Sequence, residues 1–191
     1  MAIPPRNPCP GHNRDFSGEG HNKARTKTKA NYQRGRSRYM QSDTLLVREA
    51  AENDLAAVLS LYTHLHDADE KADGRALERA WREILADPRT RLFLLEYEGV
   101  PVSSCVLHIL QNLTRGARPY GLIENVVTRR EFRNRGFGTA LLDHALGHAW
   151  RQNCYKVMLL TGRSEQNVFR LYEKAGFVRG AKEGLIAYPP Q

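Results

Sequence analysis

The sequence of 191 residues predicts one α/β (α+β) domain in which a mixed β-sheet carries helices on its faces. Apolar residues make up 41% of the chain, which is enough for a core. Strand-like runs and segments with the 3.6-residue period of a helix follow one another in the order β-α-α-β-β-β-α-β-α-β. No segment approaches the roughly 20 apolar residues of a membrane-spanning helix, which excludes an integral membrane protein.

The first half of the domain begins with a strand-like run at Thr44–Arg48. Two helical patterns follow, over Glu52–His64 and over Arg75–Ala86, and the second ends at Asp87-Pro88. The next two runs are rich in β-formers and are separated by Glu98-Gly99, which predicts a hairpin of strands Arg91–Tyr97 and Val100–Leu110.

The second half alternates strands and helices. We expect strands at Tyr120–Thr128 and Tyr155–Thr161, and a long helix at Gly136–Gln152 whose leucines and alanines face inward. A helix at Glu165–Ala175 ends at Gly176, because glycine commonly ends a helix. The remaining segment, Phe177–Tyr188, is expected to supply one or two closing strands.

Residues 1–43 differ in composition from the rest of the chain and are expected to be a basic, disordered leader. They hold four of the nine prolines and almost no aliphatic residues. Residues 1–39 carry nine Lys and Arg against two acidic residues, so they account for +7 of the net charge of +8. The leader could be a tail that contacts an anionic partner, but a passive leader, or a true start at Met40, is favoured because charged tails are usually only solvated.

Cysteine and histidine usage gives no sign of a disulfide or metal site. Cys9, Cys105 and Cys154 are scattered without metal-ligand spacing, which suits a reducing cytoplasm. The helical pair His144 and His148 lacks a third ligand. The group formed by His64, His66, Asp67, Asp69 and Glu70 is interpreted as an exposed loop, so no metal is expected.

The segment that carries chemistry is IENVVTRREFRNRGFGTALLDHAL, in which a strand, a basic loop and a helix follow one another. The free amides at the start of the helix would point at one spot with the helix dipole behind them, which is a seat for a pyrophosphate. These amides belong to Gly136, Phe137, Gly138 and Thr139. The alternative to a pyrophosphate site is a loop with a solvated basic face whose glycines only turn the chain.

The hexapeptide Arg133-Asn134-Arg135-Gly136-Phe137-Gly138 resembles the Arg/Gln-x-x-Gly-x-Gly/Ala signature of the GNAT superfamily of acetyl-CoA-dependent N-acetyltransferases. Upstream TLLVREAAENDLAAVLSLYTHLH and downstream NCYKVMLLTGRSEQNVFRLYEKAGF resemble the flanks of that family, so the resemblance covers about residues 44–188. It implies that residues 44–191 are an N-acetyltransferase domain with a mixed, mostly antiparallel sheet, splayed central strands and helices on both faces.

The resemblance also implies which residues bind acetyl-CoA, the cosubstrate of these acyltransferases. The end of the predicted fourth strand would pair with the pantetheine arm through Val126, Val127 and Thr128. The loop and helix start would hold the pyrophosphate through Arg133, Asn134, Arg135, Gly136, Phe137, Gly138 and Thr139. Asn167 matches an asparagine that contacts the cofactor arm, and Tyr172 matches a tyrosine beside the thioester sulfur.

Acetyl transfer to a primary amine needs a base, because an alkylamine with a pKa near 10.4 is only about one part in 2,500 neutral at pH 7. Glu124 is the best candidate, acting directly or through water. It lies two residues before Val126, which puts both side chains on one face of a regular strand. Tyr172 can return a proton to the departing thiolate. Glu124 could instead bind substrate or be structural, and Tyr172 could belong to the core.

We therefore expect a cytoplasmic enzyme that acetylates a small primary amine, and the sequence leaves room for a homodimer. A protein or peptide N-acetyltransferase is the alternative, because specificity on one scaffold resides in loops. A less favoured alternative is a module that senses acetyl-CoA and binds nucleic acid through the basic tail.

The first prediction concerns the leader. Deleting residues 1–39 should leave the Tm and the kcat/KM for a small amine essentially unchanged, because these residues offer almost nothing to a core. Any affinity for RNA, DNA or anionic membranes should disappear with the deleted charge. Thermal melts and kinetics of the full chain and of a chain starting at Met40, at low and moderate salt, measure this. A large loss of activity on a small amine would show that the leader completes the domain.

Overall fold

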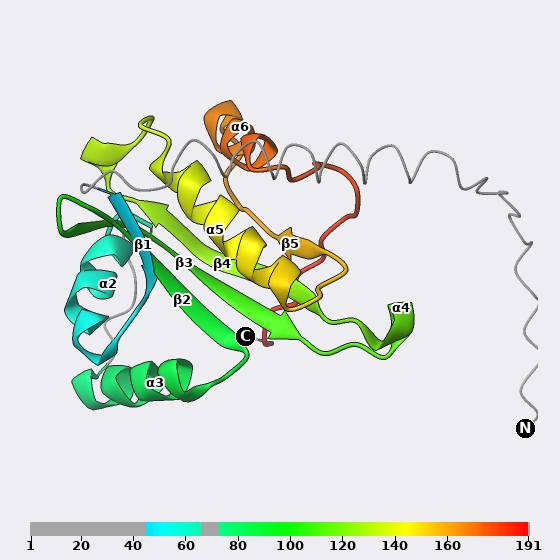
Figure 1. The fold of residues 1–191 in the computed structure, drawn as a ribbon, viewed down its shortest axis with the longest axis horizontal. Helices are drawn as coiled ribbons and strands as arrows, with labels where there is room; N and C mark the ends of the chain where they lie inside the picture. The colour runs from blue at the N-terminus through cyan, green and yellow to red at the C-terminus, as the bar shows by residue number, and fades with distance from the viewer. Residues whose placement is uncertain (1–44, 66–72, 191) are drawn as a thin grey trace, which may run out of the picture.

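The computed structural model describes residues 45–65 and 73–190 (Figure 1). Its sheet has five strands in the order β1-β2-β3-β4-β5. All neighbours are antiparallel except the parallel pair β4 and β5. The strands are β1 (Leu45–Glu49), β2 (Thr90–Tyr97), β3 (Val100–Leu110), β4 (Tyr120–Thr128) and β5 (Val157–Leu159). The predicted α/β fold with a mixed, mostly antiparallel sheet is confirmed, whereas the leader and residues 66–72 lie outside the described residues.

The helices follow the predicted order, with shifts of a few residues at their ends. They are η1 (Glu52–Asp54), α2 (Leu55–Tyr62), α3 (Gly74–Ala86), η2 (Arg130–Phe132), α5 (Phe137–Arg151) and α6 (Gln166–Lys174). A short α4 (Thr114–Ala117) in the β3–β4 connection was not predicted. It contains the left-handed residues Arg115 and Gly116, so it is a turn without the apolar period of a helix.

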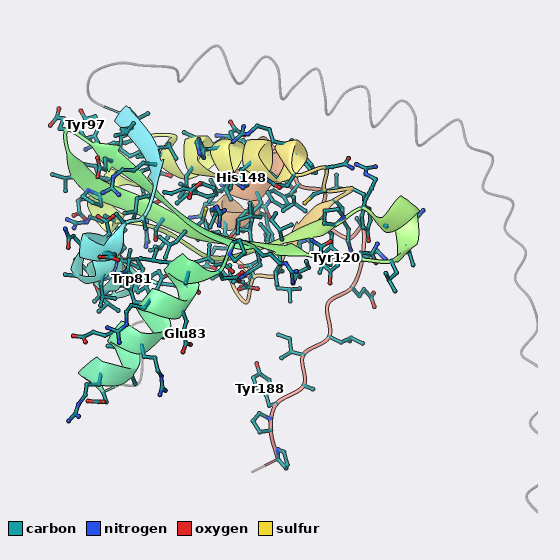
Figure 2. All side chains as sticks on the ribbon, turned by 60° about the horizontal axis from the view of Figure 1, so that its bottom comes forward. Trp81, Glu83, Tyr97, Tyr120, His148 and Tyr188 are labelled. Atoms are coloured by element: carbon teal, nitrogen blue, oxygen red, sulfur yellow. The ribbon has the colours of Figure 1, made fainter. Side chains whose placement is uncertain are left out.

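Two apolar layers lie on opposite faces of the sheet, with α5 on one face and α2 and α3 on the other (Figure 2). The alternation along β2 shows how the sequence builds both layers. Phe93 and Leu95 pack in the layer under α5, whereas Leu92 and Leu94 pack in the layer with α2 and α3. Because β2 is buried on both faces, its sequence is a continuous run of apolar residues with no polar alternation.

The β2–β3 hairpin is confirmed. Glu98 and Gly99 have φ values of 51° and 76°, the left-handed conformations that a two-residue hairpin turn requires. β4 then pairs with β3 along its length, but the register shifts near its end. Ser104 lies opposite Val127 and Val106 lies opposite Glu124, so two residues of β4 face one residue of β3. This is a β-bulge, and it determines how β4 presents its side chains to the site.

The predicted strand at Tyr155–Thr161 forms only as the three residues of β5. β5 pairs with Gly121–Ile123 of β4, and within the described residues β4 has no strand partner on that side from Glu124 onward. Gly121 permits the pairing that does form, since a Cβ there would lie 3.0 Å from Val157 Cγ2. The two strands therefore separate where the sequence predicts the cofactor.

The predicted closing strands at Phe177–Tyr188 were wrong: the described segment forms neither strand nor helix. Figure 2 shows it leading away from the sheet to Tyr188. Leu185 is 94% exposed and Tyr188 is 81% exposed. Their apolar character predicted a strand, but a strand also needs a neighbouring edge for its backbone hydrogen bonds, which local sequence does not reveal.

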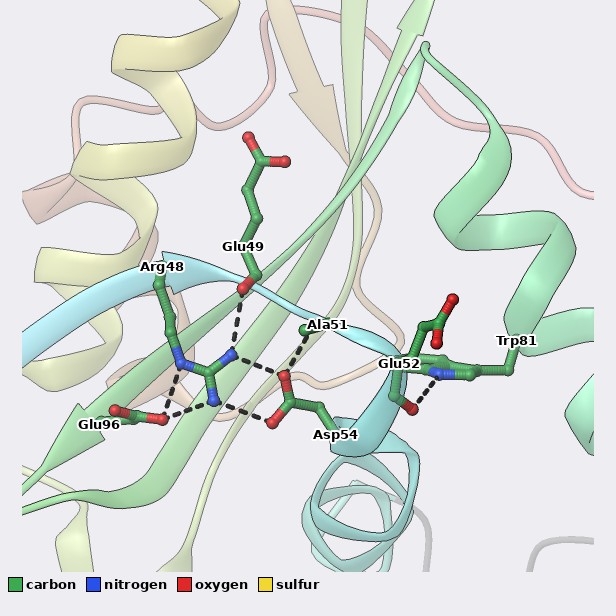
Figure 3. A network of polar contacts seen from close by, with 7 residues as sticks. All are labelled: Arg48, Glu49, Ala51, Glu52, Asp54, Trp81 and Glu96. Carbon is green, nitrogen blue, oxygen red and sulfur yellow. Dashed lines mark hydrogen bonds and ion pairs between the residues drawn. The ribbon is translucent and has the colours of Figure 1, made fainter.

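A polar network joins β1, η1 and β2 at the edge of the sheet (Figure 3). Arg48 Nη1 and Nη2 bind the two carboxylate oxygens of Asp54 at 2.6 and 2.8 Å, and Arg48 Nε binds Glu96 Oε1 at 2.8 Å. Asp54 also accepts a bond from the Ala51 amide at 2.7 Å. The hydrogen bond from Arg48 holds the pKa of Asp54 below its ordinary value. The network fixes the chain where it turns from the edge strand into α2.

The second prediction tests this network. Arg48→Met should lower the free energy of unfolding at pH 7 by about 2–3 kcal/mol, because it leaves two carboxylates without their partner. Since the pKa of Asp54 is lowered on folding, its contribution is complete above about pH 4 and is lost as the pH falls through the lowered value. Urea unfolding at pH 7 and pH 3 should show the deficit shrinking in acid. The exposed Arg82→Met is the control, and an equal deficit at both pH values would contradict the assignment.

Candidate functional site

A cavity of about 1090 Å³ opens where β4 and β5 separate. Its walls are the end of β4, the loop and first turn of α5, the segment that follows β5, and α6. The cavity is lined by almost all of the residues singled out in the sequence: Glu124, Val126, Val127, Thr128, Arg133, Asn134, Gly136, Phe137, Gly138, Thr139, Asn167 and Tyr172. The tertiary structure thus brings three distant segments of the chain to one site.

The N-terminus of α5 supplies backbone donors to this cavity. The first helical hydrogen bond runs from the Ala140 amide to the Gly136 carbonyl at 3.0 Å, so the amides of residues 136–139 have no partner within the helix. Gly136 has a φ of 86°, a left-handed conformation that costs other residues energy. The glycine therefore turns the chain so that these amides face the cavity, where the dipole of a 15-residue helix favours an anion.

Gly138 has a different role from Gly136. A Cβ at Gly138 would lie 3.2 Å from Leu171 Cδ1 and 3.4 Å from Thr128 Oγ1. The missing side chain therefore lets the first turn of α5 pack closely against both α6 and the end of β4. The spacing between the two cavity walls depends on this contact.

Two arginines of the predicted motif point in different directions. Arg135 does not line the cavity, and its guanidinium lies 5.1 Å from the centre of the Phe132 ring. Arg133 lines the cavity and its Nε donates to the Thr128 carbonyl at 3.1 Å. Sequence spacing alone does not separate the two, because an irregular loop has no fixed side-chain period.

The end of β4 is fixed from the side of β3. Ser103 Oγ donates to the Val127 carbonyl at 2.6 Å and lies 2.8 Å from Thr128 Oγ1. Ser103 is fully buried, so these bonds are shielded from water. The last residues of β4 are held in place although no strand pairs with their other edge.

The bulge corrects one prediction about Glu124. Asn125 has a φ of 52°, and the extra residue breaks the alternation of the strand. Val126 packs in the layer under α5, whereas Glu124 pairs with Val106, which belongs to the layer on the α2 face. Glu124 and Val126 are therefore on opposite faces, and Glu124 shares its face with Val127. The prediction that Glu124 and Val126 share a face holds only for a regular strand, so it was wrong.

Tyr172 lines the cavity from α6, and Glu124 lines it from β4. Burial raises the pKa of the Tyr172 hydroxyl above the ordinary value; the charge of Arg163 opposes this rise, and the charge of Glu124 adds to it. The phenol therefore stays protonated at neutral pH and can donate a proton. Its ring also packs against Phe177, with centroids 6.1 Å apart, so part of the side chain belongs to the core.

Arg163, which was not predicted from the sequence, follows β5 and lines the cavity. Its Nη2 donates to the Leu65 carbonyl at 2.8 Å, at the end of α2. Arg133 Nη2 donates to the neighbouring His64 carbonyl at 3.2 Å. A basic residue just past the end of a predicted parallel strand was the available signal, since ligands bind outside the carboxyl ends of such strands.

The histidines singled out in the sequence lie partly within and partly outside the described residues. The His144 ring meets Phe93 edge-on and the His148 ring is tilted against it, with ring centroids 4.9 and 5.5 Å from that of Phe93. No group of three or more His, Cys, Asp or Glu side chains among residues 45–65 and 73–190 is arranged to hold a metal ion. His66, Asp67, Asp69 and Glu70 lie outside the described residues. No described helix is long and apolar enough to cross a membrane.

Comparisons with known proteins agree with this geometry. The acetyltransferase (GNAT) family matches residues 57–177. A glucosamine 6-phosphate N-acetyltransferase from Trypanosoma brucei brucei is 33% identical over 133 residues, which are 70% of this chain and 88% of the relative.

Solved structures show the same fold. A structure from Agrobacterium tumefaciens str. C58, assigned as an acetyltransferase, is 40% identical with a TM-score of 0.70, covering 75% of this chain and 99% of that one. Glucosamine-6-phosphate N-acetyltransferase from Arabidopsis thaliana is 20% identical with a TM-score of 0.66, covering 77% and 100%, and shows the fold alone. The family match spans most of the described domain, and this chain belongs to the GNAT family of acetyltransferases.

Proposed function

We propose that this enzyme transfers an acetyl group from acetyl-CoA to the primary amine of a small molecule by direct attack. One observation carries the proposal. A single cavity joins the free amides of the α5 N-terminus, the unpaired edge of β4, and the side chains Glu124 and Tyr172. An anion seat, a slot for an amide-bearing arm and an acid–base pair are the parts that acetyl transfer to an amine needs.

The residues present fit acetyl-CoA. The amides of residues 136–139 would bind the pyrophosphate, with Arg133 and Asn134 beside them. The edge of β4 at Val126, Val127 and Thr128 would bind the pantetheine arm by strand-like hydrogen bonds, and Asn167 lines the opposite wall. Acetyl-CoA supplies the activated acetyl group as a thioester.

Proton movement is assigned to two side chains. Glu124 accepts the proton that the amine must lose, directly or through water, because a protonated amine has no free electron pair to attack with. The Tyr172 hydroxyl donates a proton to the thiolate that departs, and its raised pKa keeps that proton available at neutral pH. Cys105 is not assigned a role as nucleophile: it is fully buried, and burial raises the pKa of its thiol to about 12.

The acceptor class is the finer part of the proposal. The family acts on amines, and the relative from Trypanosoma brucei brucei is named for an amino sugar phosphate. We propose amino sugars, amino acids and polyamines as the first acceptors to test, with acetyl-CoA and detection of the free thiol. A peptide acceptor that outperforms all of these would favour the protein N-acetyltransferase alternative.

The third prediction concerns the anion seat. Gly136→Asp should weaken acetyl-CoA binding about 10- to 100-fold relative to Gly136→Asn, because it places a negative charge where a phosphate must bind. Asparagine has nearly the same shape and also tolerates the left-handed φ of 86° at this position. Calorimetry measures both affinities, and circular dichroism checks that both variants fold. Equal affinities in two folded variants would exclude a phosphate at the start of α5.

The fourth prediction concerns the acid–base pair. Glu124→Gln and Tyr172→Phe should each lower kcat about 10²–10⁴-fold while leaving acetyl-CoA affinity nearly unchanged. Glu124→Gln should also remove the acidic limb of the pH–rate profile, because its amide cannot take up a proton. Steady-state kinetics across pH and equilibrium binding measure the two effects separately. If the profile of Glu124→Gln keeps its shape, the residue has a binding or structural role.

A further inference from the structure

Asn125 is the left-handed residue of the bulge in β4; it is exposed and lines the cavity. Its φ of 52° is a conformation that glycine adopts at lower cost than asparagine. The backbone of the bulge therefore does not by itself need an amide side chain at this position. Glu124, the residue before it, lines the same cavity, so two consecutive side chains of β4 border one space. Asn125 thus adds a polar group beside the proposed base.

Tyr62, the last residue of α2, fixes the orientation of this amide. Burial raises the pKa of Tyr62, and its hydrogen bond with the Asn125 side chain opposes the rise. A hydrogen bond that lowers the pKa of a phenol is one donated to its oxygen, because it stabilises the phenolate. The NH₂ group of Asn125 is therefore the donor. Within residues 45–65 and 73–190 the Asn125 side chain has no other hydrogen bond, so its Oδ1 atom is left to accept from a ligand.

The amide lies on the side of the cavity that the cosubstrate leaves for the acceptor. Its partner Tyr62 packs in the layer on the α2 face of the sheet, to which Glu124 also belongs, whereas α5 and its proposed pyrophosphate seat lie on the other face. His64 and Leu65, at the end of α2, line the cavity beside them. A ligand that displaces water from the amide oxygen must supply a hydrogen-bond donor, because an unpaired acceptor costs binding energy.

We propose that Asn125 binds the acceptor through a hydroxyl group on the carbon next to the reacting amine, and that Tyr62 is the positioning residue for its amide; this rests on the proposed function. The acceptor class is then the vicinal amino alcohols. Consecutive Cα atoms are about 3.8 Å apart, so Glu124 and Asn125 suit groups on neighbouring carbons of one ligand. Aspartate also tolerates the left-handed conformation, but it would place a second negative charge beside Glu124 and favour a second ammonium group. A neutral amide oxygen suits a hydroxyl instead.

The experiment compares two amines of nearly the same shape, which bind the full chain in the presence of CoA. One is trans-2-aminocyclohexanol, and the other is trans-2-methylcyclohexylamine, in which a methyl group replaces the hydroxyl. NMR titration gives both dissociation constants. We expect the unaltered chain to bind the amino alcohol about tenfold more tightly, because the methyl analogue leaves the amide oxygen unpaired. Asn125→Gly should reduce this ratio to less than about twofold, since glycine keeps the left-handed backbone but lacks the amide. Tyr62→Phe should give a ratio between these two.

Asn153→Gly is the matched control, because Asn153 is another left-handed asparagine, with a φ of 60°, and does not line the cavity. The proposal is overturned if the unaltered chain binds neither amine or binds both equally. It is also overturned if Asn125→Gly weakens both amines to the same degree, loses affinity for CoA, or changes the ratio no more than Asn153→Gly does. Because CoA carries no acetyl group, the readout is binding alone. An amino alcohol that binds with the expected preference but is not acetylated from acetyl-CoA would count against the proposed function and leave this proposal standing.

Discussion

The bulge in β4 is the constraint on which the rest of the site depends. It places Asn125 and Val126 opposite the single residue Cys105, so the strand bends and its side chains change face after Glu124. A regular β4 could continue its ladder with β5, whereas the observed pairing ends at Ile123 and Leu159. The separation of the two strands, and with it the cavity, begins at the same point of the chain.

Contacts on both sides hold the bulge in place. Cys105 is fully buried beneath it, and Ser103 bonds the Val127 carbonyl just beyond it. On the α2 side, the side chain of Asn125 forms a hydrogen bond with Tyr62. Burial raises the pKa of Tyr62, and this hydrogen bond opposes the rise. Asparagine tolerates the left-handed conformation that the bulge requires. The local strain is thus balanced by burial and hydrogen bonding, as is common at functional sites.

The opposite wall of the cavity depends on close packing instead of strand pairing. α6 follows the short β5 and contacts the first turn of α5 through Leu171 and Gly138. Tyr172 is the next residue on α6, so this contact places both the amides proposed to bind an anion and the proposed acid. Arg133 and Arg163 extend this coupling to the end of α2, where both donate to the backbone. The arginine hydrogen bonds and the apolar packing therefore connect the same elements: the start of α5, α6 and the end of α2.

Local sequence was sufficient to predict the elements that are determined by turn residues, helix ends or apolar periodicity. The hairpin at Glu98 and Gly99, the helix that begins after Gly136, and the ends of α3 and α6 were predicted because turn, capping and periodicity rules act within a few residues. The glycine motif also pointed to the start of α5 as the proposed anion site, and twelve of the site residues named from the sequence line the cavity.

Tertiary structure alone decided the remainder. The bulge at Asn125 reverses the expected relation between Glu124 and Val126, because register depends on the neighbouring strand. The segment 177–188 has strand composition but no partner among the described residues, so it forms no strand. Arg163 becomes a neighbour of Arg133 only because two loops meet at the end of α2, a long-range contact that no local pattern encodes.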